Sequence, residues 1–224
     1  MAIDFPSNPT NGQVYSNWIY DSSITAWRNV NTDTGIGTLN AMGLKNVVPT
    51  SVVVDSGSAT VNANGFIEFS GATALKLNGV FSATYNSYKI IFSQQSASAT
   101  NDLYVRLRAS GTDLSASYYA NGTLATASTI SGVDLVNISQ WTVNALHSGT
   151  GISHASTTME VIQPFLPKPT TFQSKGGSWT STQNKTFNLA GFNSNTSAYD
   201  GITFFPSGAG TTMGGNIQVF GYTD

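Results

Sequence analysis

The pattern that most constrains this fold lies in residues 85–110, where apolar and polar residues alternate in two stretches. The apolar members are Tyr88, Ile90 and Phe92 in the first stretch and Leu103, Val105, Leu107 and Ala109 in the second. Successive side chains of a strand point to opposite faces, so this period of two predicts two strands that each bury one face. Residues 94–101 between them are rich in Ser, Ala and Asn and are expected to form a surface loop. We therefore expect an adjacent antiparallel pair at the centre of a sheet.

The composition indicates the same fold class. Only 9% of the residues are charged, against roughly 25% in a typical soluble domain. Ser, Thr, Asn and Gly fill the polar positions instead, and these residues favour strands and turns over helices. The net charge is −2. Because no cluster of Lys and Arg is present to neutralise phosphates, nucleic acid is not expected as a partner.

Turn signals separate about a dozen short β-like runs after residue 50, at the spacing of a β-sandwich. These runs lie near residues 52–54, 59–63, 66–69, 74–78, 88–93, 103–109, 135–146, 158–165, 172–179, 186–192, 202–205 and 217–222. Asn64-Gly65 and Asp200-Gly201 are turn dipeptides. The predicted fold class is therefore all-β, with a jelly-roll-like antiparallel β-sandwich.

The chain divides into three predicted parts. Residues 1–32 are dense in turn formers and hold two expected strands of a small β-hairpin module. Residues 33–46 are punctuated by glycine and are expected to form a linker with at most one helical turn near residues 39–42. Residues 47–224 contain enough alternating strands to bury a core of their own. An isolated hairpin is marginally stable in water, so the N-terminal module must pack on something.

Segments in both folded parts carry a resemblance to known structural proteins. The segment Phe5–Tyr15 and the hairpin that ends at residues 26–30 resemble the small β modules that recur in phage structural proteins, especially tail fibres and related appendages. A second set of segments resembles, in the same order, the C-terminal domains of uncharacterised phage tail or fibre proteins. This set comprises residues 49–52, 66–69, 77–81, the strand with Tyr85 and Tyr88, residues 103–112, Tyr118-Tyr119 and residues 214–222. The resemblance implies a structural virion protein.

No group of residues predicts catalysis, a cofactor or a metal site. His147 and His154 lie in a stretch rich in Ser, Thr and Gly and are interpreted as exposed loop residues. The alternative is a metal pair at a trimer axis, but a zinc site usually needs three or four close ligands, and the chain has no cysteine. The two glutamates, Glu68 and Glu160, are expected on solvent-facing strand positions rather than as a glycosidase pair.

Arg106 and Arg108 share the polar face of their predicted strand. Such a pair could clamp an anion, but the preferred interpretation is that both arginines solvate the wet side of the strand.

Aromatic side chains in polar segments are the candidate binding residues, because a sugar can be held by an aromatic platform with amide or hydroxyl donors. The candidate glycan-contact residues are Tyr118, Tyr119, Trp179 and Tyr199, whereas Trp141 is expected in the core. One of the adjacent residues Tyr118 and Tyr119 must face outwards. The candidate virion-attachment or oligomer contacts are Trp18, Tyr20 and Trp27.

We therefore expect a non-enzymatic structural virion protein of a tailed bacteriophage. It would be a tail fibre or receptor-binding appendage that attaches to a host-surface glycan through the C-terminal β-sandwich, with other virion structural proteins as partners. One alternative is a head fibre, capsid decoration or tail adaptor protein that binds no receptor, and another is a cellular lectin-like module. The N-terminus has no signal-peptide pattern and no run is apolar enough for membrane insertion, so we expect synthesis in the host cytoplasm and localisation in the virion.

We predict that the protein forms a homotrimer held partly by residues 1–32. The small aromatic hairpin is too short to stand alone, and the low charge would not keep copies apart. Light scattering at micromolar concentration should therefore give a mass of three chains. A stable monomer of 23.6 kDa would contradict the prediction.

Overall fold

The computed structural model describes residues 6–15, 18–23, 25–29, 43–150, 154–179 and 184–223. The regular secondary structure in these ranges consists of strands alone, which confirms the all-β prediction. This part of the chain has no helix that is long and apolar enough to span a membrane. Two compact units are present, residues 44–222 and residues 1–43 together with 223–224.

Most of the expected linker lies outside the described residues, including the possible helical turn near residues 39–42. Its last residues are not an irregular connection, because strand β4 (Gly43–Val47) begins there and pairs with β20 (Met213–Thr223). The two units therefore divide a few residues earlier than the expected boundary at residue 47.

The N-terminal unit is a three-stranded antiparallel sheet, not the two-stranded hairpin that the sequence predicts. Its strands are β1 (Val14–Tyr15), β2 (Trp18–Asp21) and β3 (Ala26–Asn29), in that order across the sheet. The expected single strand over 13–20 is two strands, because Tyr15 pairs back onto Trp18. The Trp27 ring packs against both Tyr20 and Tyr15, with ring centroids 5.5 and 6.2 Å away. A third strand and this ring cluster give the unit more internal contact than a lone hairpin has.

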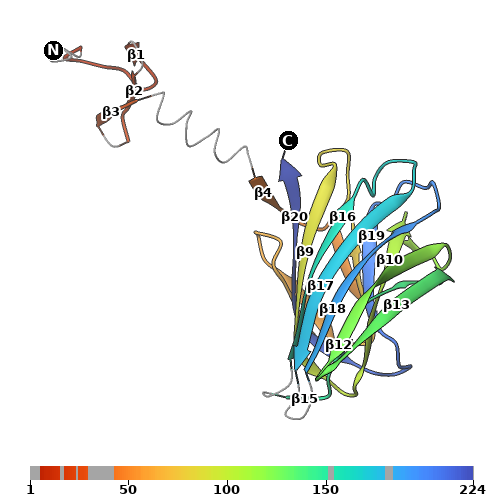
Figure 1. Ribbon diagram of the computed structural model, residues 1–224. Coiled ribbons are helices and arrows are strands. Elements are labelled where there is room, and N and C mark those ends of the chain that lie inside the picture. Colours follow the sequence, from red (N-terminus) through yellow and green to blue (C-terminus); the bar gives the residue numbers. More distant parts are fainter. Residues whose placement is uncertain are drawn as a thin grey trace. The chain divides into compact units, whose positions relative to one another are not determined.

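Residues 44–222 form two antiparallel sheets that face each other across one core, a β-sandwich (Figure 1). The six-stranded sheet has the order β11 (Thr112–Asp113), β10 (Asn101–Ala109), β19 (Gly201–Pro206), β8 (Leu75–Asn78) and β5 (Ser51–Val54), with β14 (Trp141–Leu146) also paired to β10. The eleven-stranded sheet has the order β13 (Thr129–Ile138), β12 (Tyr118–Thr126), β18 (Asn184–Asn193), β17 (Thr170–Trp179), β16 (His154–Ile162), β9 (Ser87–Ala97), β20, β7 (Ile67–Ala72) and β6 (Ser58–Val61), with β15 (Gly149–Thr150) on β9 and β4 on β20. The pairs β7–β20, β8–β19 and β12–β18 are nested along the chain, so the chain folds back on itself as a long hairpin wrapped around the core.

The two alternating stretches that dominate the sequence do not pair with each other. They form β9 and β10, which belong to different sheets. The alternation itself is confirmed, since Ile90 and Phe92 on β9 and Leu103 and Val105 on β10 are buried. These side chains fill the core from opposite sides. An alternating pattern shows that one face of each strand is buried, but it is the same for two strands in facing sheets as for two neighbours in one sheet.

The expected surface loop between the two stretches is shorter than residues 94–101. Strand β9 continues to Ala97, and Gln94 is buried. The Gln94 side chain pairs with the backbone of His147, accepting from its N–H at 3.1 Å and donating to its C=O at 2.6 Å. A buried amide is stable there because both of its polar atoms have partners.

Two further differences concern strands that the sequence hides. The expected run over 135–146 is two strands, β13 and β14, which lie in different sheets. Strand β12 contains Ala, Asn and Gly and was not predicted. Its intrinsic β propensity is low, but both of its edges are hydrogen-bonded, to β13 and to β18.

Aromatic side chains join the sheets at the centre of the core. Trp141 from the six-stranded sheet is fully buried, as expected, and stacks on Phe172 of the eleven-stranded sheet with ring centroids 4.1 Å apart. Tyr118 meets the same Trp141 ring edge-on at 5.0 Å. Phe92 and Phe204 stack across the sheets at 5.7 Å.

Arg108 does not solvate the wet side of its strand as the sequence predicts. It lies on the outer face of the six-stranded sheet, yet it is only 5% exposed. Its guanidinium donates to Asn78 Oδ1 at 3.0 Å and Thr203 Oγ1 at 2.8 Å, forms an ion pair with Asp113 and donates to Gly111 C=O. The arginine therefore ties β8, β10, β19 and β11 together, and its donors are not free to clamp an anion.

Replacement of Arg108 by alanine should lower the free energy of unfolding by about 3 kcal/mol, because Asp113 is left without its buried partner. Denaturant unfolding measures this change. R106A is the matched control: Arg106 donates to Ser139 C=O at 3.1 Å and to Gln140 Oε1 at 3.0 Å and lies over the Phe205 ring, but it is less buried and forms no ion pair among the described residues. Its loss should cost less, about 2 kcal/mol, because no buried carboxylate is left without its partner. Equal losses in the two variants would contradict the role given to Arg108.

Candidate functional site

The strongest candidate for a binding site is the outer face of the eleven-stranded sheet. Side chains of β18 alternate, so that Phe187 and Leu189 enter the core while Asn188, Ala190 and Phe192 face solvent. The same alternation along β12, β17 and β16 gives a broad face over strands that lie side by side in Figure 1. About half of the outward residues of these strands are Ser, Thr, Asn or Gln, and few are charged, so the face offers many neutral hydrogen-bonding groups.

Two aromatic rings lie together on this face. Tyr119 of β12 and Phe192 of β18 are direct cross-strand partners. Their rings are parallel within 10°, with centroids 4.9 Å apart, and Phe192 is 41% exposed. Stacked rings of this kind contribute more than their buried area alone. The pair therefore presents an ordered aromatic platform to solvent.

The platform borders a shallow hollow of about 410 Å³, which we call the aromatic hollow. Its lining includes Tyr119, Phe192, Val136, Ala190, Asn121 and Asp134. The Asn121 amide, oriented with its nitrogen towards β13, donates to Asp134 Oδ1 at 2.7 Å. The second carboxylate oxygen and the Asn121 carbonyl oxygen can accept hydrogen bonds from a ligand. The aromatic hollow thus combines an apolar floor with hydrogen-bond acceptors at its rim.

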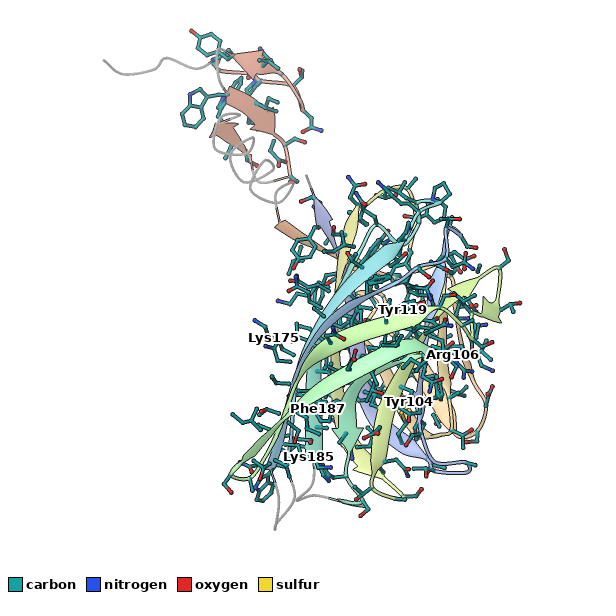
Figure 2. All side chains as sticks on the ribbon, turned by 45° about the vertical axis from the view of Figure 1, so that its right-hand side comes forward. Tyr104, Arg106, Tyr119, Lys175, Lys185 and Phe187 are labelled. Atoms are coloured by element: carbon teal, nitrogen blue, oxygen red, sulfur yellow. The ribbon has the colours of Figure 1, made fainter. Side chains whose placement is uncertain are left out.

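Two polar hollows continue the face across β18, β17 and β16. The larger, of about 480 Å³, is lined by Ser156, Thr158, Lys175, Gly177, Thr186 and Asn188, among others. The smaller, of about 110 Å³, is lined by Thr158, Glu160, Gln173 and Lys175. They share Thr158 and Lys175, so they form one continuous polar region. Figure 2 labels Tyr119 on β12 and Lys175 on β17, one in each region.

The structure separates the four predicted glycan-contact residues. Tyr119 faces outwards, and Trp179 at the end of β17 is 44% exposed. Tyr118 and Tyr199 are buried, so neither ring can serve as a platform, and both predictions need correction. The Tyr118 hydroxyl accepts from Leu107 N–H at 2.8 Å and donates to Leu114 C=O at 3.0 Å, which bridges the sheets.

Tyr199 fills a similar structural role. Its hydroxyl donates to Asn193 Oδ1 at 3.1 Å, and burial raises its pKa to about 12. The two buried tyrosines occur in polar segments because each hydroxyl forms hydrogen bonds within the fold.

Phe192, which completes the platform with Tyr119, is not among the residues predicted from the sequence. The alternation over 186–192 was visible and places Phe192 on the face opposite Phe187 and Leu189. The sequence does not show that β18 pairs with β12, and this pairing is what places Phe192 beside Tyr119.

The three predicted attachment residues lie together in the N-terminal unit. Tyr20 and Trp27 are cross-strand partners, and Trp18 precedes them on β2. All three are partly buried within this small sheet. The contact of the Trp27 ring with Tyr20 helps to hold the sheet, and all three side chains leave some surface accessible.

His147 contradicts the prediction of an exposed loop residue. It is 2% exposed, and its Nε2 lies 2.9 Å from Ser178 Oγ. Burial lowers the pKa of His147, and the positive charge of Lys185, labelled in Figure 2, lowers it further. His154 is exposed, as expected, but it lies in strand β16. Within the described ranges, His, Asp and Glu do not gather in any group of three or more that could hold a metal ion.

Comparison with known proteins gives no functional assignment. No family model matches the chain, and no curated protein matches it. Among solved structures, domain 4 of AbnA, a GH43 extracellular arabinanase from Geobacillus stearothermophilus determined in complex with arabinotriose, is similar at 8% identity, with a TM-score of 0.30, over 80% of this chain and 81% of that one. A protein of unknown function from Shewanella oneidensis MR-1 is similar at 8% identity, with a TM-score of 0.27, over 81% and 79%.

We predict that His147 makes the fold less stable in mild acid. The unfolded chain keeps the ordinary pKa of 6.5, whereas the folded chain has a lower one, so the unfolded state binds more protons below pH 6.5. The free energy of unfolding should therefore fall as the pH drops through 6.5 towards the lower pKa of the folded chain, and change little through this group below that pKa. Denaturant unfolding across this range should show a shallower slope for H147Q than for the natural chain.

The exposed His154 supplies the matched control for this prediction. H154Q removes the histidine on β16 without touching the pair of His147 with Ser178. It should retain the slope of the natural chain. Indistinguishable slopes for H147Q and the natural chain would show that His147 does not titrate differently in the folded state.

Proposed function

We propose that the protein is a non-enzymatic structural component of a tailed-bacteriophage virion, which attaches to glycans on the host surface through the sandwich of residues 44–222. The observation that carries the glycan-binding part is the exposed, stacked pair of Tyr119 and Phe192 on a sheet face that is poor in charge. The virion part is supported by the resemblance of the N-terminal and C-terminal segments to phage tail-fibre proteins.

The chemistry of the aromatic hollow suits a sugar ring. A pyranose has a face of C–H groups, which packs on an aromatic ring, and hydroxyls around its rim. The Tyr119 and Phe192 rings would take the C–H face, while Asp134 and the Asn121 carbonyl would accept from the hydroxyls. Such a site makes few contacts with a sugar and therefore binds it weakly. Three copies in a homotrimer would raise the apparent affinity for a surface that carries many identical glycans.

The placement of the carboxylates supports binding rather than hydrolysis. Asp134 and Glu160 are the acidic residues that line the aromatic and polar hollows. The strand pairing places them in one row, four strand spacings apart through Asn121, Ala190 and Gln173. That separation is about 19 Å, whereas a glycosidase holds its two carboxylates about 5–10 Å apart.

Replacement of Tyr119 or Phe192 by alanine should weaken binding of the purified protein to host cells or to their isolated surface glycan by about tenfold, because each change removes half of the stacked platform. Calorimetry or a cell-binding assay measures the effect. V53A is the control, since Val53 is 45% exposed on the six-stranded sheet, away from this face. Gold-labelled antibody should decorate the appendages of whole virions. Binding unaffected by both aromatic changes would reject this face as the receptor site.

A further inference from the structure

A lysine without a partner lies in the polar region beside the aromatic hollow. Lys175 lines both polar hollows, and its cross-strand neighbours are the neutral residues Thr158 and Asn188. Among the described residues, the ion pairs join Lys76 to Asp55 and Arg108 to Asp113. Within the same ranges the Lys175 ammonium has no hydrogen bond or ion pair. It therefore presents three donors and a positive charge to solvent.

The carboxylates on this face are already engaged by neighbouring donors. Glu160 accepts from the Tyr222 hydroxyl at 2.6 Å, and Asp134 accepts from Asn121 at 2.7 Å. The hydrogen bond to Glu160 raises the pKa of Tyr222 to about 12, so the phenol remains a donor at neutral pH. Lys89 is the cross-strand partner of Glu160 on its other side. Lys89, Glu160 and Lys175 together carry a net charge of +1, which favours an anionic ligand group at Lys175.

The platform and the lysine are too far apart to serve one sugar unit. Asn188 pairs with Lys175 and lies four residues before Phe192 on β18. At about 3.3 Å per residue along the strand and 4.8 Å between strands, the backbones at Phe192 and Lys175 are about 14 Å apart. The surface between them carries the short or neutral outward side chains of Ala190, Gln173 and Asn188. A ligand that uses both ends must be a chain of several sugar units.

We propose that this face binds an acidic oligosaccharide, with one sugar ring stacked on Tyr119 and Phe192 and an anionic group of another unit paired with Lys175. The inference rests on the proposed glycan-binding function and names the class of glycan. A net charge of +1 over Lys89, Glu160 and Lys175 suits a single spaced carboxylate or phosphate. It does not suit a nucleic acid, whose phosphate repeats need several clustered lysines and arginines.

The test measures binding of the full chain to a panel of uronic-acid oligosaccharides and to their neutral methyl esters. The natural chain should bind the acids about tenfold more tightly than the esters, and added salt should weaken that preference. K175Q should lose the preference while its affinity for the esters stays the same. K168Q is the matched control, because Lys168 is exposed in a connection outside this sheet face, and it should behave as the natural chain.

A second arm replaces the uronic acids by glycerol-phosphate teichoic acid. Binding of only one ligand series, lost in K175Q, identifies carboxylate or phosphate as the anion and supports the inference. Binding of esters and acids with equal affinity, abolished by Y119A, overturns the acidic class but leaves the proposed function standing. Equal loss of acid and ester binding in K175Q also overturns the acidic class. Failure of every glycan to bind overturns both proposals.

Discussion

The cross-sheet packing around Trp141 determines which side chains reach the outer face. The indole stacks on Phe172 and meets Tyr118 edge-on, so β12 must turn Tyr118 towards the core. The Tyr118 hydroxyl then bridges to β10 by accepting from Leu107 N–H. Because neighbouring side chains of a strand point in opposite directions, this single choice sends Tyr119 to solvent. The platform is therefore a consequence of how the core is filled, and a repacked core would move it.

Because the chain has few charged residues, each charged group has a large effect on the fold or on the local potential. Arg108 is buried among partners that satisfy it, and Lys76 pairs with Asp55. Those two cations serve the fold and are unavailable to a ligand. The face that carries Tyr119 is covered instead by hydroxyl and amide groups, which form hydrogen bonds without strong long-range fields. Against such a background, the net charge of +1 carried by Lys89, Glu160 and Lys175 determines the local potential.

The sequence predicted what depends on local pattern and missed what depends on pairing. The alternation in β9 and β10 correctly identified their buried faces, but it could not show that Phe92 and Leu103 fill one core from opposite sheets. The adjacent Tyr118 and Tyr119 required one outward ring, yet only the contact of Tyr118 with Trp141 decides which. His147 follows a buried strand into a polar stretch, and its burial depends on the distant Gln94 side chain. No local signal encodes such long-range partners.

The same dependence on pairing makes the aromatic platform sensitive to the β12–β18 alignment. A slip of one residue would exchange the faces of β18 and bring Phe192 into the core. Two glycines oppose such a slip, since they let the strands approach closely in the observed alignment. A Cβ at Gly191 would lie 2.0 Å from Tyr119 C=O, and one at Gly122 would lie 2.0 Å from Asn188 C=O. Because shifted pairing would place bulkier residues at those contacts, the glycines favour the one alignment in which Tyr119 faces Phe192.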